Sequence, residues 1–200
     1  GSPDATWEGD ADDMDLSFDG NALLAKAPAG QSRVSIYAPL PEMTESGITT
    51  LTFDAYFPSG GANHAIFGVA GEDQIAETGA ARLGGNDRYI TFGADPQNLT
   101  KYTDWGNSLL PGDTQDTWYH IWLVYDIDAG EMHFYAAPFE STAPAEPIAS
   151  YTLETDYTDI SYFVVGAEIG GVEGMKIDNL YQANAALTTL SPTAGEIGGD

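Results

Sequence analysis

TWYHIWLVYDIDAGEMHFYAA, residues 117–137, contains two runs of strand-forming residues separated by a short turn. Asp128, Ala129 and Gly130 between the runs suit the backbone of a tight hairpin turn. Alternate residues of the first run point to opposite faces, and both faces are largely apolar. One face carries Trp118, His120, Trp122 and Val124, and the other carries Tyr119, Ile121, Leu123 and Tyr125. Such a strand belongs in the middle of a sheet, with a core on one side and a covering loop or a ligand on the other.

Short strands with turn signals between them recur along the rest of the chain. The clearest covers residues 48–57, in which the row Leu51, Phe53, Ala55 and Phe57 is expected to be buried. A strand that begins at residue 34 is expected to end at Pro39 and Pro41, and residues 94–115 are expected to form a long loop. Further strands are expected at residues 16–18, 65–69, 88–92, 149–153, 162–167 and 175–182. This number of strands predicts a two-sheet antiparallel sandwich and disfavours an immunoglobulin-like one.

Two stretches also resemble a known architecture. WYHIWLVYD, a short Gly turn and EMHFY resemble the central hairpin of laminin-G-like jelly rolls, which share the concanavalin-A-like lectin and glucanase architecture. GGVEGMKIDNLYQANAALT, residues 170–188, resembles the closing strand of that family. The resemblance implies an all-β, two-sheet jelly-roll sandwich. It says less about function, because the fold hosts lectins, hydrolases, lyases and adhesion modules.

Size and composition favour one globular domain. The chain has 200 residues, of which 42% are hydrophobic, and this is enough for a single core. We expect one sandwich domain over residues 3–190, with residues 1–2 as a cloning remnant. Residues 191–200 have the composition of a linker, so the domain is expected to be attached to other domains of a larger protein.

The charge and the missing residue types exclude several partners. A formal net charge of −25 excludes general binding to nucleic acid, which needs a cationic surface. Cysteine is absent, so disulfides and thiolate metal sites are excluded. With no apolar run of 18 residues, membrane insertion is not expected. The acidity is typical of marine, halophilic or calcium-rich settings, and the resemblance implies an extracellular or cell-surface protein of bacterial origin.

Catalytic signatures of this architecture are incomplete. Its glucanases carry Glu-x-Asp-x-x-Glu on one strand, whereas residues 8–13 and 154–159 both end in Asp at the last position. Its lyases use Arg, Gln, His and Tyr; His120 and His133 are expected on adjacent strands near Tyr135, but the flanking motifs are missing. The chain is therefore expected not to be an enzyme.

Calcium is the metal that the resemblance implies. Ca²⁺ takes six to eight oxygen ligands, and related jelly-roll modules hold a structural Ca²⁺ between an early segment and an Asp of the last strand. Asp178 in KIDNLY matches that Asp, and Glu8 and Asp10 are the expected early partners. The alternative is that Asp178 only accepts backbone hydrogen bonds.

The stretch 82–107 combines aromatic, amide and basic side chains. Sugars stack on flat apolar rings and are hydrogen-bonded at their edges by such polar groups. Three of the six basic residues of the chain lie in this stretch, which favours a uronate or sulfated glycan, although chance clustering remains the alternative. Trp105 is expected either on the binding surface or as a plug over the core. The predicted ligand-binding residues are Arg82, Arg88, Tyr89, Lys101, Tyr102, Trp105 and Asn107.

These observations predict a non-catalytic, lectin-like carbohydrate-binding module that recognises a polysaccharide. Two alternatives stay open at this point. One is a glycoside hydrolase or polysaccharide lyase on the same fold, and the other is a structural or adhesion domain of a surface protein.

Overall fold

The computed structural model describes residues 8–9, 15–19, 22–26, 34–57, 65–71, 90–95, 98–101, 117–152, 159–167 and 175–186. All regular elements in these ranges are strands. They are β1 (Glu8–Gly9), β2 (Asp15–Asp19), β3 (Ala22–Lys26), β4 (Val34–Thr44), β5 (Ile48–Phe57), β6 (Ala65–Ala70), β7 (Ile90–Asp95), β8 (Asn98–Lys101), β9 (Thr117–Asp126), β10 (Glu131–Pro138), β11 (Ala149–Thr152), β12 (Ile160–Ala167) and β13 (Met175–Ala183).

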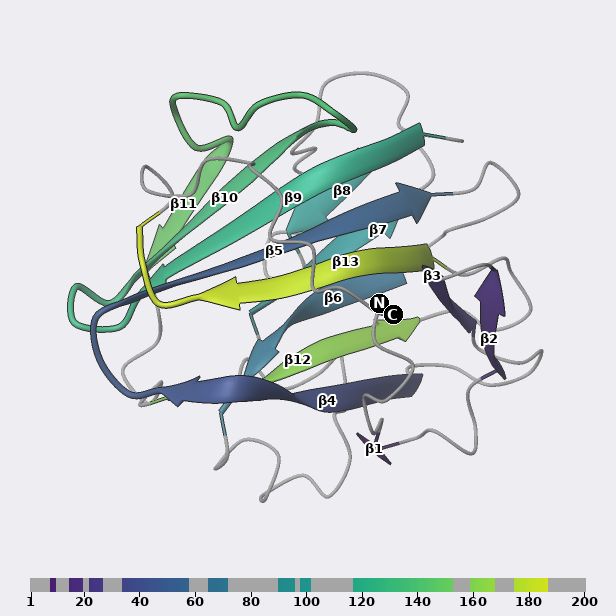
Figure 1. Ribbon diagram of the computed structural model, residues 1–200, viewed down its shortest axis with the longest axis horizontal. Coiled ribbons are helices and arrows are strands. Elements are labelled where there is room, and N and C mark those ends of the chain that lie inside the picture. The colour runs from purple at the N-terminus through teal and green to yellow at the C-terminus, as the bar shows by residue number, and fades with distance from the viewer. Residues whose placement is uncertain are drawn as a thin grey trace, which may run out of the picture.

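The strands form two antiparallel sheets that stack into a sandwich (Figure 1). The six-stranded sheet has the order β1-β4-β12-β6-β7-β8, and the seven-stranded sheet has the order β11-β10-β9-β5-β13-β3-β2. In Figure 1, β9, β5 and β13 of one sheet lie in front of β8, β7 and β6 of the other. The predicted two-sheet antiparallel sandwich is confirmed. The predicted hairpin is also confirmed, because β9 and β10 pair from Asp126 opposite Glu131 onward.

The core lies between the sheets and is built from alternate residues of the inner strands. From the seven-stranded sheet it takes the Tyr119, Ile121, Leu123 and Tyr125 face of β9, as well as Leu51, Phe53 and Ala55 of β5. From the other sheet it takes Ile36, Val69, Phe163 and Val165. Phe53 and Phe163 meet edge to face across the sandwich, with ring centroids 5.1 Å apart. The predicted buried row of β5 is confirmed for Leu51, Phe53 and Ala55, and the side chain of Phe57 lies outside the described part.

The prediction that a strand ends at Pro39 and Pro41 is wrong, because β4 continues through both prolines to Thr44. The pairing of β4 explains why this is tolerated. One edge of β4 pairs with β12, where Pro39 faces Tyr162, and along the other edge the described residues of β1 pair with Ile36 and Tyr37. Beyond Tyr37 the missing proline N–H groups break no bond to β1, as is usual for proline at a sheet edge.

The prediction of an uninterrupted loop over residues 94–115 is also wrong. β7 extends to Asp95, and β8 pairs antiparallel with it, from Asp95 opposite Asn98 to Phe92 opposite Lys101. The physical reason is that β8 is short and contains a single apolar residue, Leu99, so it leaves almost no alternating pattern. The hairpin expected around residues 84–87 lies outside the described residues.

Within the described ranges, no helix has the length and apolar character that a membrane crossing requires.

Candidate functional site

The candidate site lies on the outer face of the seven-stranded sheet, the side that points away from the six-stranded sheet. Because one set of alternate residues of β9 enters the core, the other set projects outward. Directly paired residues of neighbouring strands project to the same side, so the register gives rows across β9, β5 and β13. The rows of this outer face are Trp118–Tyr56–Lys176, His120–Asp54–Asp178 and Trp122–Thr52–Tyr181.

The outer face is only partly open to water. Trp122 is 4% exposed, whereas Tyr181 is 49% exposed, and Trp118, Tyr56 and Lys176 lie between these extremes. One row farther along, the Thr50 hydroxyl donates a hydrogen bond of 2.7 Å to the carbonyl of Ala185, which follows β13. The expectation of a core on one side of β9 is confirmed, and a covering loop or a ligand on the other side stays a prediction.

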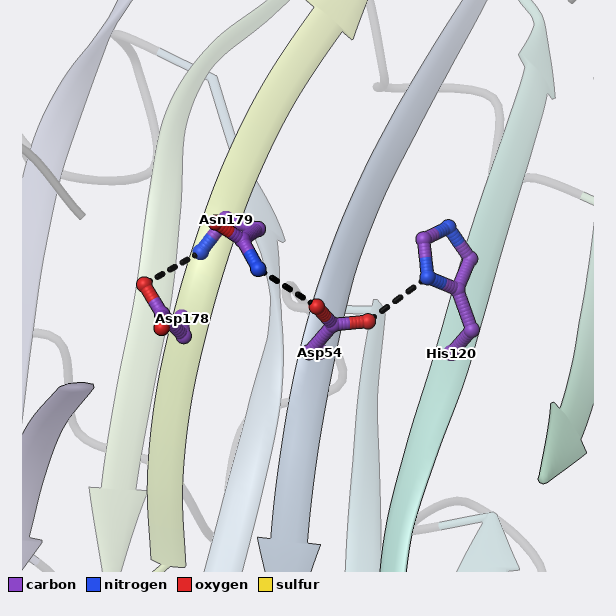
Figure 2. A network of polar contacts seen from close by, with 4 residues as sticks. All are labelled: Asp54, His120, Asp178 and Asn179. Atoms are coloured by element: carbon purple, nitrogen blue, oxygen red, sulfur yellow. Dashed lines mark hydrogen bonds and ion pairs between the residues drawn. The ribbon is translucent and has the colours of Figure 1, made fainter. Parts of the chain in front are cut away.

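A buried carboxylate sits at the centre of this face. The side chain of Asp54 is 3% exposed, and its Oδ1 lies 2.6 Å from Nδ1 of His120, whose side chain is 26% exposed. Nδ2 of Asn179 donates a hydrogen bond of 2.6 Å to Oδ2 of Asp54 (Figure 2). Among the residues that the structure describes, Oδ1 has no hydrogen-bond partner of regular geometry, so the close contact with Nδ1 of His120 is the interaction that balances it. Since an unpaired buried charge is strongly unfavourable, His120 and Asn179 make the position of Asp54 possible.

This contact assigns the proton of the His120 ring. An ionised carboxylate is only an acceptor, so a nitrogen 2.6 Å from it must carry a hydrogen. When the ring is neutral, its single hydrogen therefore lies on Nδ1, and Nε2 carries the lone pair. Figure 2 shows Nδ1 turned toward Asp54 and the second ring nitrogen turned away from it. The ring also packs against Trp122, with centroids 4.4 Å apart.

Asn179 reaches Asp54 because β13 contains a β-bulge. Asp178 pairs with Asp54 and Tyr181 pairs with Thr52, so β13 spans this interval with one more residue than β5. Asn179 has a φ of 54°, in the left-handed region that Asn tolerates better than most residues. The bulge thus directs the amide of Asn179 onto the same face as Asp54.

An aromatic pair lies next to His120 along the sheet. The rings of Tyr56 and Trp118 are 5.4 Å apart and tilted by 46°, and Nζ of Lys176 lies 5.2 Å from the centre of the Tyr56 ring. Two residues of a strand advance the chain by about 6.7 Å, so this pair is one row away from His120. A flat molecule on the outer face would contact apolar rings and a directed hydrogen-bonding group together.

His133 makes contacts that are separate from those of His120. Its Nδ1 lies 2.8 Å from the hydroxyl of Ser150, and its Nε2 lies 3.5 Å from a carboxylate oxygen of Glu131. His120 and His133 lie on the adjacent strands β9 and β10, as expected, but His120 pairs with Ala137 and His133 with Val124. The register therefore separates the two imidazoles along the sheet.

The predicted metal ligands are only partly described. Oδ1 of Asp178 accepts a hydrogen bond of 2.8 Å from the backbone N–H of Asn179. Glu8 lies on β1 of the six-stranded sheet, whereas Asp178 lies on the seven-stranded sheet, and Asp10 is outside the described residues. Among the described residues, no group of three or more acidic, His or Cys side chains could hold a metal ion. Calcium binding stays a prediction.

The predicted ligand-binding residues lie mostly outside the described ranges. Lys101 is the last residue of β8, the edge strand of the six-stranded sheet. It is therefore on the other sheet from the outer-face rows. The remaining six are outside the described residues: Arg82, Arg88, Tyr89, Tyr102, Trp105 and Asn107.

The two acidic stretches that approach the glucanase signature are described only at their ends. Asp159 is buried, and one of its carboxylate oxygens accepts a hydrogen bond of 2.5 Å from the Ser161 hydroxyl. Glu154 lies outside the described residues, and only residues 8–9 of the first stretch are described. The sequence drew no attention to Asp54 or Asn179 as site residues. The available signal was that Asp54 is the one charged residue of the strand at residues 48–57, on the face opposite Phe53.

Known structures resemble this fold at very low sequence identity. No protein-family model and no curated protein matches the chain. Lectin II from Ulex europaeus superposes with a TM-score of 0.57 at 10% identity, covering 90% of this chain and 92% of that chain. Lectin UEA-II complexed with galactose has a TM-score of 0.50 at 10% identity, with 88% and 94% covered. A sialidase has a TM-score of 0.53 at 10% identity and is matched over 86% of this chain but 16% of its own.

The chain therefore has the concanavalin-A-like jelly-roll fold of these lectins, as the central hairpin and the closing strand predicted.

Proposed function

We propose that this chain is a non-catalytic, lectin-like carbohydrate-binding module that recognises a polysaccharide. The observation that carries the proposal is the outer face, where the Tyr56–Trp118 pair lies one row from the polar group of His120. Sugar rings present apolar C–H faces and hydroxyl edges, and they bind where aromatic rings and fixed polar groups lie together. The fold supports the proposal, since a solved structure that it resembles is a lectin complexed with galactose.

The proposal includes the predicted loop residues as a second contact region. Arg82, Arg88, Tyr89, Lys101, Tyr102, Trp105 and Asn107 supply rings, amides and cations in one stretch of the chain. Arg and Lys side chains in so acidic a protein would favour a uronate or sulfated unit of the polysaccharide. Trp105 would then stack on a sugar ring rather than close the core.

The module is proposed to act outside the cell, secreted or at the cell surface of a bacterium, in a marine or otherwise saline setting. The net charge of −25 supports this, because salt and divalent cations screen such a charge. The domain would span residues 3–190 and be attached to other domains through the linker-like residues 191–200. A structural Ca²⁺ held by Asp178, Glu8 and Asp10 is part of the same proposal.

A glycan array tests the function directly. The expected result is binding to one class of polysaccharide, weakened by Trp118→Ala on the outer face or by Trp105→Ala in the loop stretch. The exposed Phe139, at 48%, provides the matched control Phe139→Ala, which should leave binding unchanged. Absence of any glycan signal from folded protein would contradict the proposal and favour a structural or adhesion domain.

A glycan-cleaving enzyme is the second candidate, and the His120–Asp54 contact is the observation that favours it. A carboxylate that orients an imidazole through Nδ1 leaves Nε2 able to accept a proton, as in a general base. Release of new reducing ends from a polysaccharide panel, abolished by His120→Ala or by Glu154→Ala, would select this candidate. Binding without cleavage would select the module.

A further inference from the structure

We infer that His120 determines the specificity of the outer face, by offering Nε2 as a fixed hydrogen-bond acceptor to a hydroxyl of a neutral glycan. The inference rests on the proposed carbohydrate-binding function and adds the ligand class and the residue that reads it. Its starting point is the placement of the single ring proton. With that hydrogen on Nδ1, which lies 2.6 Å from the Asp54 carboxylate, the other nitrogen of a neutral His120 can only accept.

Two residues contact the His120 ring directly and hold Nε2 in one orientation, and a third acts through Asp54. Asp54 binds Nδ1 from β5, Trp122 packs against the ring from the same strand, and Asn179 fixes Asp54 from β13. Asp54 itself is 3% exposed and cannot turn toward water without losing both partners. A side chain fixed before binding loses little conformational entropy when the ligand arrives, so its hydrogen bond adds more to affinity.

As a hydrogen-bond acceptor, Nε2 of His120 favours ligands with groups that donate a hydrogen bond. A sugar hydroxyl can donate to Nε2, and anionic glycans carry hydroxyls too, but their ionised carboxylate or sulfate groups have only acceptor oxygens and cannot bind this nitrogen. The surrounding charge adds to this selection, because Asp54 and Asp178 share the row of His120 and the whole chain carries a net charge of −25. The outer face is therefore suited to a neutral glycan, in contrast to the basic loop stretch.

Calorimetry with defined oligosaccharides tests the ligand class. The probes are cellohexaose, laminarihexaose, xylohexaose and mannohexaose as neutral ligands, and hexagalacturonate as an anionic one. The wild-type chain is expected to bind at least one neutral hexaose. If it binds only hexagalacturonate, the inference is overturned while the carbohydrate-binding function stands; if it binds no hexaose and no arrayed glycan, the function itself fails.

His120→Asn tests the residue. The Asn amide can still donate to Asp54 from roughly the position of Nδ1, so the buried carboxylate keeps a partner, but the outward acceptor is removed. The expected result is about tenfold weaker binding of the neutral hexaose, the effect of one well-placed hydrogen bond. His133→Asn is the matched control, because His133 is 28% exposed on the next strand and should leave affinity unchanged. Equal affinity of His120→Asn and wild type overturns the inference.

Asp54→Asn tests whether the tautomer, rather than the shape of the site, sets the specificity. Nδ2 of Asn179 donates toward position 54, so the new amide should turn its oxygen to Asn179 and its NH₂ to His120. Nδ1 must then accept, and the ring proton moves to Nε2, which becomes a donor. Nitrogen-15 NMR of the three histidines reports the tautomer, with His120→Asn identifying the signals.

Binding of the neutral hexaose should follow the position of that proton. The inference predicts weak binding by Asp54→Asn if the proton is found on Nε2, and retained binding if it stays on Nδ1. Unchanged affinity with the proton on Nε2, or lost affinity with a folded protein and the proton still on Nδ1, contradicts it.

Discussion

The pKa of Tyr135, a residue on the outer face, depends on the burial of its ring and on a carboxylate. Its ring is half-buried on β10, and burial, together with the negative charge of Glu146, raises the pKa of the Tyr135 phenol above the usual value of about 10. Both causes disfavour the phenolate. A pKa that is raised in the folded state contributes stability that is complete below the unfolded pKa and is lost as the pH rises through the folded value.

Glu146→Gln should therefore lower the pKa of Tyr135 toward its usual value without removing the effect of burial. Ultraviolet absorbance of the phenolate measures this in an alkaline titration, with Tyr135→Phe identifying the contribution of this one ring among the 11 tyrosines. Glu140→Gln removes an exposed carboxylate from the same loop and is the matched control. An unchanged transition in Glu146→Gln would show that burial acts alone.

At the scale of elements, the bulge of β13 is the feature on which the site depends. Asn179 combines a φ of 54° with the hydrogen bond to Asp54, and two substitutions separate these roles. Asn179→Gly keeps the backbone unstrained and loses the bond, whereas Asn179→Ala loses the bond and places a Cβ in the left-handed region. We expect Ala to be less stable than Gly by about 1–2 kcal/mol in urea unfolding.

Both variants should be less stable than wild type, because Asp54 loses one of its two partners. Equal stability of the Gly and Ala variants would mean that the backbone at this position relaxes once the amide is removed. Glu45→Ala is a suitable reference, since Glu45 is an exposed residue in the connection between β4 and β5.

Elements with a strong alternating pattern were predictable, as was the pairing of the hairpin, but the pairing of strands distant in the sequence was not. The β9–β10 hairpin and β5 were predicted because apolar side chains recur at every second position around a clear turn. Ala22–Lys26 and Asn98–Lys101 were missed because each is short and lacks alternation. The alternation also placed Asp54 opposite the predicted buried row and His120 on the face opposite Tyr119, without showing which face of β9 enters the core. Their contact, however, depends on the register between β5 and β9, which no local pattern specifies.

At the scale of the whole molecule, the proposed Ca²⁺ would join the two sheets, since Glu8 is on the six-stranded sheet and Asp178 on the seven-stranded one. A metal that binds only the folded chain stabilises it, so EDTA should lower the melting temperature and added Ca²⁺ should restore it. Asp178→Asn should respond little to EDTA, whereas Asp128→Asn, in an exposed turn, should behave like wild type. A melting temperature insensitive to chelation in the wild-type chain would contradict the calcium prediction.

The overall fold was more predictable than the site for a physical reason. A sandwich needs only apolar residues at alternating positions of enough strands, and lectin II from Ulex europaeus meets this need at 10% identity. A site needs particular atoms at particular distances, such as Oδ1 of Asp54 and Nδ1 of His120 at 2.6 Å. The first requirement is spread over the whole chain and survives many substitutions, whereas the second depends on a few positions.

The alternation along β9 has a consequence for protein engineering. Odd-numbered positions from Tyr119 to Tyr125 build the interior, while Trp118 and His120 belong to the opposite surface. A combinatorial library restricted to positions 118, 56, 176 and 181 would leave the interior intact while replacing the proposed recognition surface. Directed evolution on this sandwich could therefore search for sugar ligands without first having to repair folding.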